Sequence, residues 1–236
     1  MSDYVNFKEK RSRGNFVGYV IASGLSFRTR TGNTRGQRNT WGQRIFDCVT
    51  AAGLFIFCLP ILVLAALAIK IESPRSAVFF TQIRYGYAGK PFRMIKLRTM
   101  VPNAEQLKSG LVASSVDRGA GFKVAQDPRI TKTGRILRGL YIDEIPQFIN
   151  VILGQMSIVG PRANSYSPES YEPWQKIRLQ VNPGITGTWQ ISRNKPYGFD
   201  ERCRMDLDYI SSKSLLTDIV ILFQTVKMLL TSFSGE

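Results

Sequence analysis

The run CVTAAGLFIFCLPILVLAALAI, residues 48–69, decides the class of fold, because no charged residue interrupts it. About 20 apolar residues are enough to cross the hydrocarbon core of a bilayer. The run starts too far from the N-terminus for a signal peptide and lacks a small-residue cleavage site. The sequence therefore predicts a membrane helix over residues 45–71.

Two topologies fit this membrane helix. Pro60 lies in its middle, where a proline removes one backbone hydrogen bond and bends a helix. Basic residues flank both ends, and positive flanks favour the cytoplasmic side. The flanking residues are Arg35, Arg38, Arg44, Lys70, Arg75 and Arg84. We therefore favour a re-entrant helix, broken at Pro60, whose two ends share one leaflet; a fully spanning helix is the alternative.

Residues 1–44 form a basic N-terminal arm. Its Lys and Arg side chains outnumber Asp3 and Glu9, and Gly, Ser, Asn and Thr separate them. This composition predicts a mostly flexible segment. Two interpretations stay open: attraction to anionic lipid head groups, at about 1 kcal/mol per basic residue near the surface, or a solvated tail.

The composition of the whole chain narrows its chemistry. The 32 Lys and Arg against 17 Asp and Glu leave a net charge of +15, which indicates nucleic acid, anionic lipid or a phosphorylated substrate as partner. The sequence has no His, so the commonest general base and transition-metal ligand are excluded. Cys48, Cys58 and Cys203 form no CxxC pair, which argues against a disulfide framework or a zinc site.

Residues 72–236 are predicted to form a small catalytic domain of α-rich mixed α/β class. Short strands are expected over residues 78–82 and 92–97, with a glycine-containing turn between them. Helices are expected from residue 104, over 142–153, over 170–180 and over 214–232. The last of these is apolar enough to suit either the core or a membrane interface.

Asp143 and Glu144 stand side by side at the expected start of the helix over residues 142–153. Arg135 and Arg138 precede them, and a helix N-terminus also favours anions. A diphosphate beside two carboxylates needs a cation between the like charges, so the pattern predicts bound Mg²⁺. Ordinary capping of the helix by both carboxylates is the alternative.

Three further groups have weaker patterns. Lys96 and Arg98 alternate with apolar residues on an expected strand and so share one face. Arg162 follows a Gly-Pro turn, and its planar fork suits phosphate. The glycine-rich stretch PGITGTWQ, residues 183–190, is a candidate for contacts with a nucleotide. Its candidate binding residues are Pro183, Gly184, Thr186 and Gln190. Each group taken alone also fits a solvated or structural role.

Taken in order, the segments KLRTM, RITKTGRILR, IDEIPQFINVILGQMSIVGPR and PGITGTWQ resemble the bacterial sugar transferase family. These proteins are monotopic phosphoglycosyl transferases that prime the assembly of exopolysaccharide, O-antigen and glycoprotein glycans. The resemblance extends over residues 41–230 and includes the apolar run with its central Pro60. An ordered set of motifs of this length is highly specific.

The resemblance implies a re-entrant helix broken at Pro60 and a ping-pong reaction. Asp143 would attack the β-phosphorus of a UDP-sugar and expel UMP. The resulting phosphosugar–aspartyl intermediate would pass its sugar phosphate to undecaprenyl phosphate. Glu144 would help to hold Mg²⁺. The basic positions of the family correspond to Lys96, Arg138 and Arg162, with Arg98 and Arg135 as secondary candidates.

The resemblance also implies membrane lipids as partners and a place at the cytoplasmic face of the bacterial inner membrane. It leaves open whether the chain forms a homodimer. Some positions depart from the family pattern: Leu59, Ala163 and Asn182 replace a Ser, a Pro and a basic residue, and no Gly precedes Arg193. None of these departures touches the Asp-Glu pair.

Two other classes of protein are alternatives. A catalytically inactive membrane-surface scaffold of the same fold would keep the apolar run, but the intact Asp143, Glu144, Lys96 and Arg162 argue against it. A nucleic-acid-binding protein would explain the charge. The uninterrupted apolar run and the lack of a recognisable binding motif argue against that class, so no nucleic-acid partner is expected.

Overall fold

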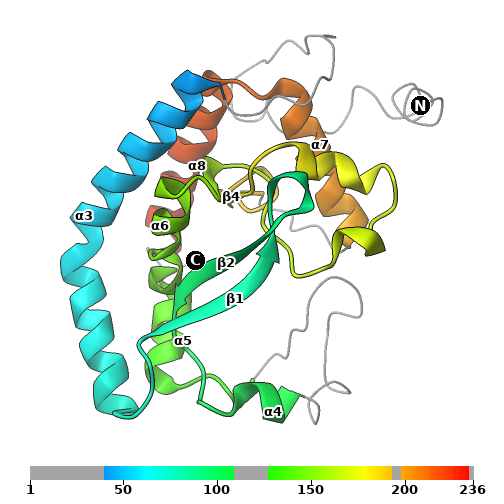
Figure 1. Cartoon of the computed structure of the whole chain (residues 1–236). Helices are drawn as coiled ribbons and strands as arrows, with labels where there is room; N and C mark the ends of the chain where they lie inside the picture. The colour runs from blue at the N-terminus through cyan, green and yellow to red at the C-terminus, as the bar shows by residue number, and fades with distance from the viewer. Residues whose placement is uncertain (1–39, 109–126, 193–197, 234–236) are drawn as a thin grey trace.

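The computed structural model describes residues 40–108, 127–192 and 198–233. The predicted arm up to residue 39, and also Arg193, lie outside these residues. Figure 1 shows a long bowed helix along one side of the molecule, a two-stranded hairpin, and a group of shorter helices and strands beside them. The predicted α-rich mixed class is confirmed at this level.

The long helix is α3 (Trp41–Glu72), which contains the predicted membrane segment. It starts within the segment assigned to the arm, because Thr40 and Gln43 form a capping box there. Pro60 lies inside it, and the two ends of the bowed helix lean toward the rest of the molecule (Figure 1). The predicted break is therefore not an interruption of the helix, since a proline removes only one backbone hydrogen bond.

The surface of α3 is strongly apolar. Phe57 is 78% exposed and Leu64 is 66% exposed, and other large apolar side chains of the helix are exposed beside them. Among the described residues, α3 is the one helix long and apolar enough to cross a membrane. Apolar side chains left uncovered on this scale mark a surface that contacts lipid or another apolar partner, which supports membrane association.

Both ends of α3 are bonded to the rest of the fold. Near its start, Arg44 donates to the carbonyl oxygens of Val151 and Ile152, at 2.6 and 2.7 Å, in the last turn of α6 (Gln147–Ile152). At its end, the Glu72 carboxylate accepts from the first two backbone N–H groups of α5 (Lys132–Gly139), at 2.9 and 3.0 Å. These are the unpaired backbone groups that every helix end leaves, so α3 caps two other helices.

The predicted strands are confirmed as an antiparallel hairpin. Strand β1 (Phe79–Tyr85) pairs with β2 (Pro91–Leu97), and η1 (Tyr87–Gly89) lies in the turn. Ala88 and Gly89 both have positive φ, 54° and 72°. Both strands are longer than expected, because pairing extends to the turn.

A second, parallel pair joins β3 (Ser157–Val159) to β4 (Gly184–Thr186). Gly184 makes this pairing possible, because a Cβ atom there would lie 2.1 Å from the backbone nitrogen of Gly160. The glycine-rich stretch is therefore partly a strand against which the Gly-Pro-Arg segment packs.

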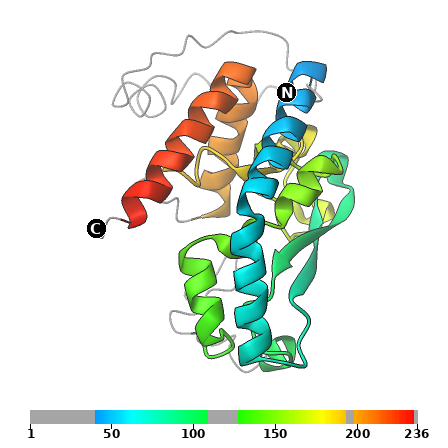
Figure 2. The same cartoon turned by 90° about the vertical axis from the view of Figure 1, so that its left-hand side faces the viewer.

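The remaining helices are short, apart from two near the C-terminus. They are α4 (Ala104–Lys108), η3 (Ile142–Glu144), η4 (Pro168–Ser170), η5 (Gln175–Gln180), α7 (Phe199–Ser212) and α8 (Leu215–Phe233). Figure 2 shows α3 between the α7–α8 pair on one side and the β1–β2 hairpin on the other.

Two helix predictions were wrong in part. The helix expected over residues 142–153 is divided into η3 and α6 at Pro146, which has no N–H to continue the hydrogen-bond ladder. The helix expected over residues 170–180 is a 3₁₀ helix, η5, in its second half only, and η4 ends at its first residue, Ser170. Helices α5 and α7 were not predicted, and glycine or charge dominates their sequences.

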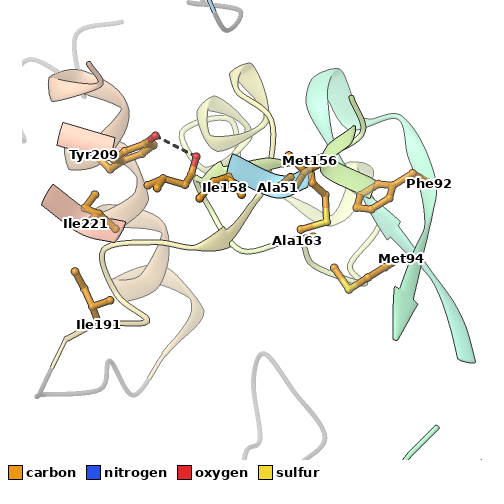
Figure 3. Packing of buried hydrophobic residues seen from close by; sticks show 11 residues of the cluster. Ala51, Phe92, Met94, Met156, Ile158, Ala163, Ile191, Tyr209 and Ile221 are labelled. Atoms are coloured by element: carbon orange, nitrogen blue, oxygen red, sulfur yellow. Dashed lines mark hydrogen bonds between the residues drawn. The ribbon is translucent and has the colours of Figure 1, made fainter. Parts of the chain in front are cut away.

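The main hydrophobic core joins these elements. It brings Ala51 of α3, Met94 of β2, Met156 before β3 and Ile221 of α8 together (Figure 3). The Tyr209 hydroxyl, on α7, donates to the carbonyl oxygen of Val159 at 3.2 Å, the dashed line in Figure 3. A second cluster packs the C-terminal half of α3 against Leu97 and Leu137. Since β2, α5 and η3 all rest on α3, the helix sets the positions of the elements around Asp143.

Candidate active site

Asp143 and Glu144 lie in η3, a single turn of 3₁₀ helix. Tyr141, just before it, has φ of 58°, which turns the chain sharply into the site. The N-cap of α6 is Pro146, and no side chain caps that helix. The two carboxylates therefore do not act as helix caps, and the capping alternative is wrong.

Glu144 is clamped by two cations. The Lys96 ammonium lies 2.7 Å from Oε1, and Arg162 bonds both carboxylate oxygens, Nη2 to Oε1 and Nη1 to Oε2 at 3.3 Å. Burial opposes ionisation, but the charges and hydrogen bonds of Arg162 and Lys96 outweigh it and hold the pKa of Glu144 well below its usual range. Glu144 is thus an anion at any physiological pH.

Asp143, by contrast with Glu144, has no bonded cation among the described residues. Its side chain is buried, at 7% exposure, and no described residue forms a hydrogen bond or ion pair with its carboxylate. Burial raises the pKa of Asp143, the charge of Lys96 lowers it and that of Glu144 raises it. Two adjacent carboxylates thus have different environments, and such divergence is typical of catalytic pairs.

Of the five predicted basic residues, the structure brings three together. Lys96 and Arg162 bind Glu144, and the charge of Arg138 also acts on Asp143. The Arg138 Nε atom donates to Thr99 Oγ1 at 2.8 Å, which holds the guanidinium between α5 and the end of β2.

The other two lie away from the carboxylates. Arg98 donates to the carbonyl oxygen of Ala77 at 2.8 Å and stacks over the Phe80 ring. Arg135 is exposed on α5, and no contact links it to Asp143 or Glu144 among the described residues. Phosphate binding by these two arginines stays a prediction.

The residues predicted from the glycine-rich stretch lie behind Arg162. The Pro183 carbonyl accepts from the Ser157 N–H at 2.8 Å, and the Gly184 N–H donates to the Pro161 carbonyl at 2.9 Å. Thr186 shares a 2.7 Å hydrogen bond with Thr225, and Gln190 donates to the Ile185 carbonyl at 2.8 Å. Here these four residues support the strand that leads to Arg162, and their contact with a nucleotide stays a prediction.

Arg178 was not predicted, and it supports the same strand. Its guanidinium forms a buried ion pair with Asp206, at 2.8 Å, and donates to the Arg162 carbonyl oxygen at 2.9 Å. It also lies over the Phe199 ring, 5.3 Å from the centroid. No local pattern could reveal this role, because Arg178 and Asp206 meet across 28 positions of the chain.

Arg84 was predicted only as part of the basic flank of the membrane segment. It is half-buried at the end of β1. Burial and the charge of Arg162 lower its pKa, and the charge of Glu144 raises it. Its spacing of two from Gln82, the last residue of the expected strand, is the signal that could have placed it on the face shared with Lys96.

The carboxylates fit Mg²⁺ only in part. Across residues 40–108, 127–192 and 198–233, no group of three or more His, Cys, Asp or Glu side chains could hold a metal ion. Mg²⁺ commonly takes one or two carboxylates and completes its shell with water and substrate phosphate. Asp143 and Glu144 can supply that pair of carboxylates, so the donor set suits an ion that arrives with a diphosphate.

Comparison with known proteins identifies the class. Residues 38–232 match the bacterial sugar transferase family, and the chain belongs to that family. The predicted resemblance is confirmed, and the protein is an enzyme of the sugar transferase class.

Named relatives align with about two thirds or more of this chain. One is a galactosyl transferase, CpsE, of Streptococcus agalactiae, 44% identical over 163 residues, which are 68% of this chain and 36% of CpsE. Another is the UDP-glucose:undecaprenyl-phosphate glucose-1-phosphate transferase of Caulobacter vibrioides, 40% identical over 200 residues, 80% of this chain and 70% of that one. The exopolysaccharide production protein ExoY of Sinorhizobium fredii is 36% identical over 190 residues, 78% of this chain and 83% of ExoY. The chain thus spans about a third of the first relative and most of the other two.

Proposed function

We propose that this enzyme transfers a hexose-1-phosphate from a UDP-sugar to undecaprenyl phosphate, releasing UMP. The reaction would be the first membrane step in the assembly of an exopolysaccharide or O-antigen type of glycan. One observation carries the proposal: the buried carboxylate of Asp143 is unpaired among the described residues, while Lys96 and Arg162 neutralise its neighbour Glu144. The names of the relatives support the choice of substrates.

The proposed reaction has two steps. A carboxylate oxygen of Asp143 attacks the β-phosphorus, and the bond from that phosphorus to the bridging oxygen breaks, so UMP leaves with the electron pair. A phosphate oxygen of undecaprenyl phosphate then attacks the same phosphorus, and the bond to Asp143 breaks. Each step needs charge stabilisation at the phosphoryl oxygens, which Lys96, Arg138 and Arg162 near the two carboxylates would supply without a His.

Glu144 has two roles in this proposal. It orients Lys96 and Arg162 through the bonds described above. Together with Asp143 it would hold Mg²⁺, which when bound neutralises charge on the diphosphate. Coordination by Glu144 would require Lys96 or Arg162 to move toward the substrate, because both now bond its oxygens.

Because the proposed acceptor is a lipid, the enzyme must lie at the membrane. The exposed apolar surface of α3 supports membrane association. Helix α8 adds a stripe of exposed apolar side chains. These are Leu216, Ile219, Phe223, Val226 and Leu230. We propose a re-entrant α3, with α8 at the interface and the catalytic domain on the cytoplasmic face of the inner membrane.

The proposal is tested with purified protein in detergent, Mg²⁺, undecaprenyl phosphate and a panel of UDP-sugars. UMP release is measured for the wild type, for Asp143→Asn and for the control Glu169→Gln, which alters an exposed carboxylate in η4. We expect release from the wild type and the control, and none from Asp143→Asn. Release by Asp143→Asn at the wild-type rate would exclude Asp143 as the nucleophile. If no donor supports release, the inactive scaffold becomes the better description.

A further inference from the structure

The hairpin places Arg84 on the same face as Lys96. In its register, Arg84 pairs with Phe92, Gln82 with Met94, and Phe80 with Lys96. Residues directly opposite in an antiparallel pair point to one face, and so do residues two apart on a strand. Phe92 and Met94 on this face are buried in the main core, so the Arg84 side chain starts from the inner face of the hairpin.

A backbone bridge then brings the chain segment of Arg84 to the segment that carries Arg162. The next residue, Tyr85, forms an isolated antiparallel bridge with Asn164, and its N–H donates to the Asn164 carbonyl at 3.1 Å. Asn164 lies two residues after Arg162. The charged groups that act on Arg84 most strongly are accordingly Arg162, which repels it, and Glu144, which attracts it.

The hydrogen bonds of Arg84 are incomplete. Its Nη2 atom donates to the neutral side chain of Gln82 at 2.7 Å. Its Nε atom is buried and has no hydrogen-bond partner among the described residues. A buried donor without an acceptor is destabilising, and a ligand oxygen would satisfy it.

The local balance of charge points to the sign of that ligand. Arg84 and Arg162 are close enough for their charges to interact, yet the carboxylate that attracts Arg84, Glu144, already bonds Arg162 and Lys96. Two neighbouring guanidinium groups repel each other unless an anion lies between them. The planar fork of arginine suits phosphate, which can accept from two arginines at once.

We propose that Arg84 and Arg162 together bind one phosphate group of a substrate. This inference rests on the proposed function, since it assigns Arg84 to the same site. Both substrates carry suitable chemistry: the diphosphate of the sugar donor and the phosphate of the lipid acceptor. Arg84 would be a binding residue, and the hairpin would position a charge that the sequence motifs do not include.

The test measures binding without turnover. Inorganic pyrophosphate is titrated calorimetrically into detergent-purified wild type, Arg84→Gln, Arg84→Lys and the control Arg93→Gln. Arg93 is an exposed residue of the same hairpin, on the opposite face. We expect Arg84→Gln to raise the Kd about tenfold or more, the effect of one lost charge-assisted hydrogen bond. The Kd of Arg84→Lys should lie between those of the wild type and Arg84→Gln. The Kd of Arg93→Gln should match that of the wild type.

Kinetics then distinguish the two sources of phosphate. A higher KM of Arg84→Gln for the UDP-sugar alone assigns the site to the donor, and a higher KM for undecaprenyl phosphate alone assigns it to the acceptor. Equal Kd values for Arg84→Gln and Arg93→Gln, or no binding of pyrophosphate by the wild type, would overturn the assignment. Thermal melting of each variant verifies that it is folded. Wild-type UMP release is a separate readout, so the proposed function can stand where this assignment fails.

Discussion

Arg162 bonds both oxygens of the Glu144 carboxylate, while the Gly-Pro turn before it and the Arg178 guanidinium behind it hold its backbone. A planar fork that meets a carboxylate in this way has a defined orientation. The guanidinium therefore has a defined orientation before substrate arrives.

The planar, two-pronged shape of the Arg162 guanidinium should contribute more to activity than its positive charge. Arg162→Lys keeps the charge and loses the paired contacts, so we expect kcat/KM for UMP release to fall at least about tenfold. Arg75→Lys, at an exposed position after α3, is the matched control and should be unaffected. An unchanged kcat/KM in Arg162→Lys would show that charge alone suffices.

The pH dependence of activity should report Asp143. Its carboxyl must be ionised to attack phosphorus, and burial raises its pKa. Activity should therefore fall on acidification at a pH above the ordinary carboxyl range near about 4. Lys96→Gln removes the cation that lowers this pKa most, so the acidic limb of kcat/KM should move to higher pH.

The control for this shift is Lys90→Gln, which removes an exposed charge in the hairpin turn. Its acidic limb should coincide with that of the wild type. A limb that stays in place in Lys96→Gln, or moves to lower pH, would mean that another group titrates in this range.

Gly184 should be essential although it meets no reacting atom. A Cβ at Gly184 would lie 2.1 Å from the Gly160 nitrogen, so β3 and β4 must separate in Gly184→Ala. We expect a loss of about 1–3 kcal/mol in unfolding free energy, as for other overpacked sites. We also expect lower UMP release, because Arg162 follows this pair of strands. Gly198→Ala, with open space around its Cβ, should retain wild-type stability and activity.

The Arg178–Asp206 ion pair should be costly to break from one side. Arg178→Met leaves Asp206, which is 1% exposed, as an unpaired buried charge. The unfolding free energy should fall by about 3–5 kcal/mol in a denaturant titration. The double variant Arg178→Met/Asp206→Leu has no such charge and should recover much of that loss. A double variant no more stable than the single one would contradict this account.

The re-entrant topology predicts where the N-terminus lies. Tags placed at each end of the chain should both be cleaved by protease added to inside-out vesicles of the inner membrane. A fully spanning α3 would instead protect the N-terminal tag in those vesicles and expose it in right-side-out ones. Protection of the N-terminal tag alone would therefore reject the re-entrant helix.

Local patterns were enough to predict much of this protein. The uncharged run over residues 48–69 predicted α3, because hydropathy is a property of contiguous residues. Two short apolar runs around a glycine turn predicted the hairpin, and a long apolar-rich run predicted α8. The ordered motifs predicted the family that residues 38–232 match. Where a proline or glycine intervened, as at Pro146, the predicted helix was too long.

Only the tertiary structure decided what these residues do for one another. Asp143 and Glu144 are neighbours of the same chemical type, and sequence cannot tell which one is clamped. Lys96 reaches Glu144 across 48 positions and Arg162 across 18, so the difference between the two carboxylates depends on how β2, η3 and the strand before Arg162 pack. The same long-range packing turned the glycine-rich stretch into a support for Arg162, because a contact between distant segments depends on their relative placement and leaves no local period in the sequence.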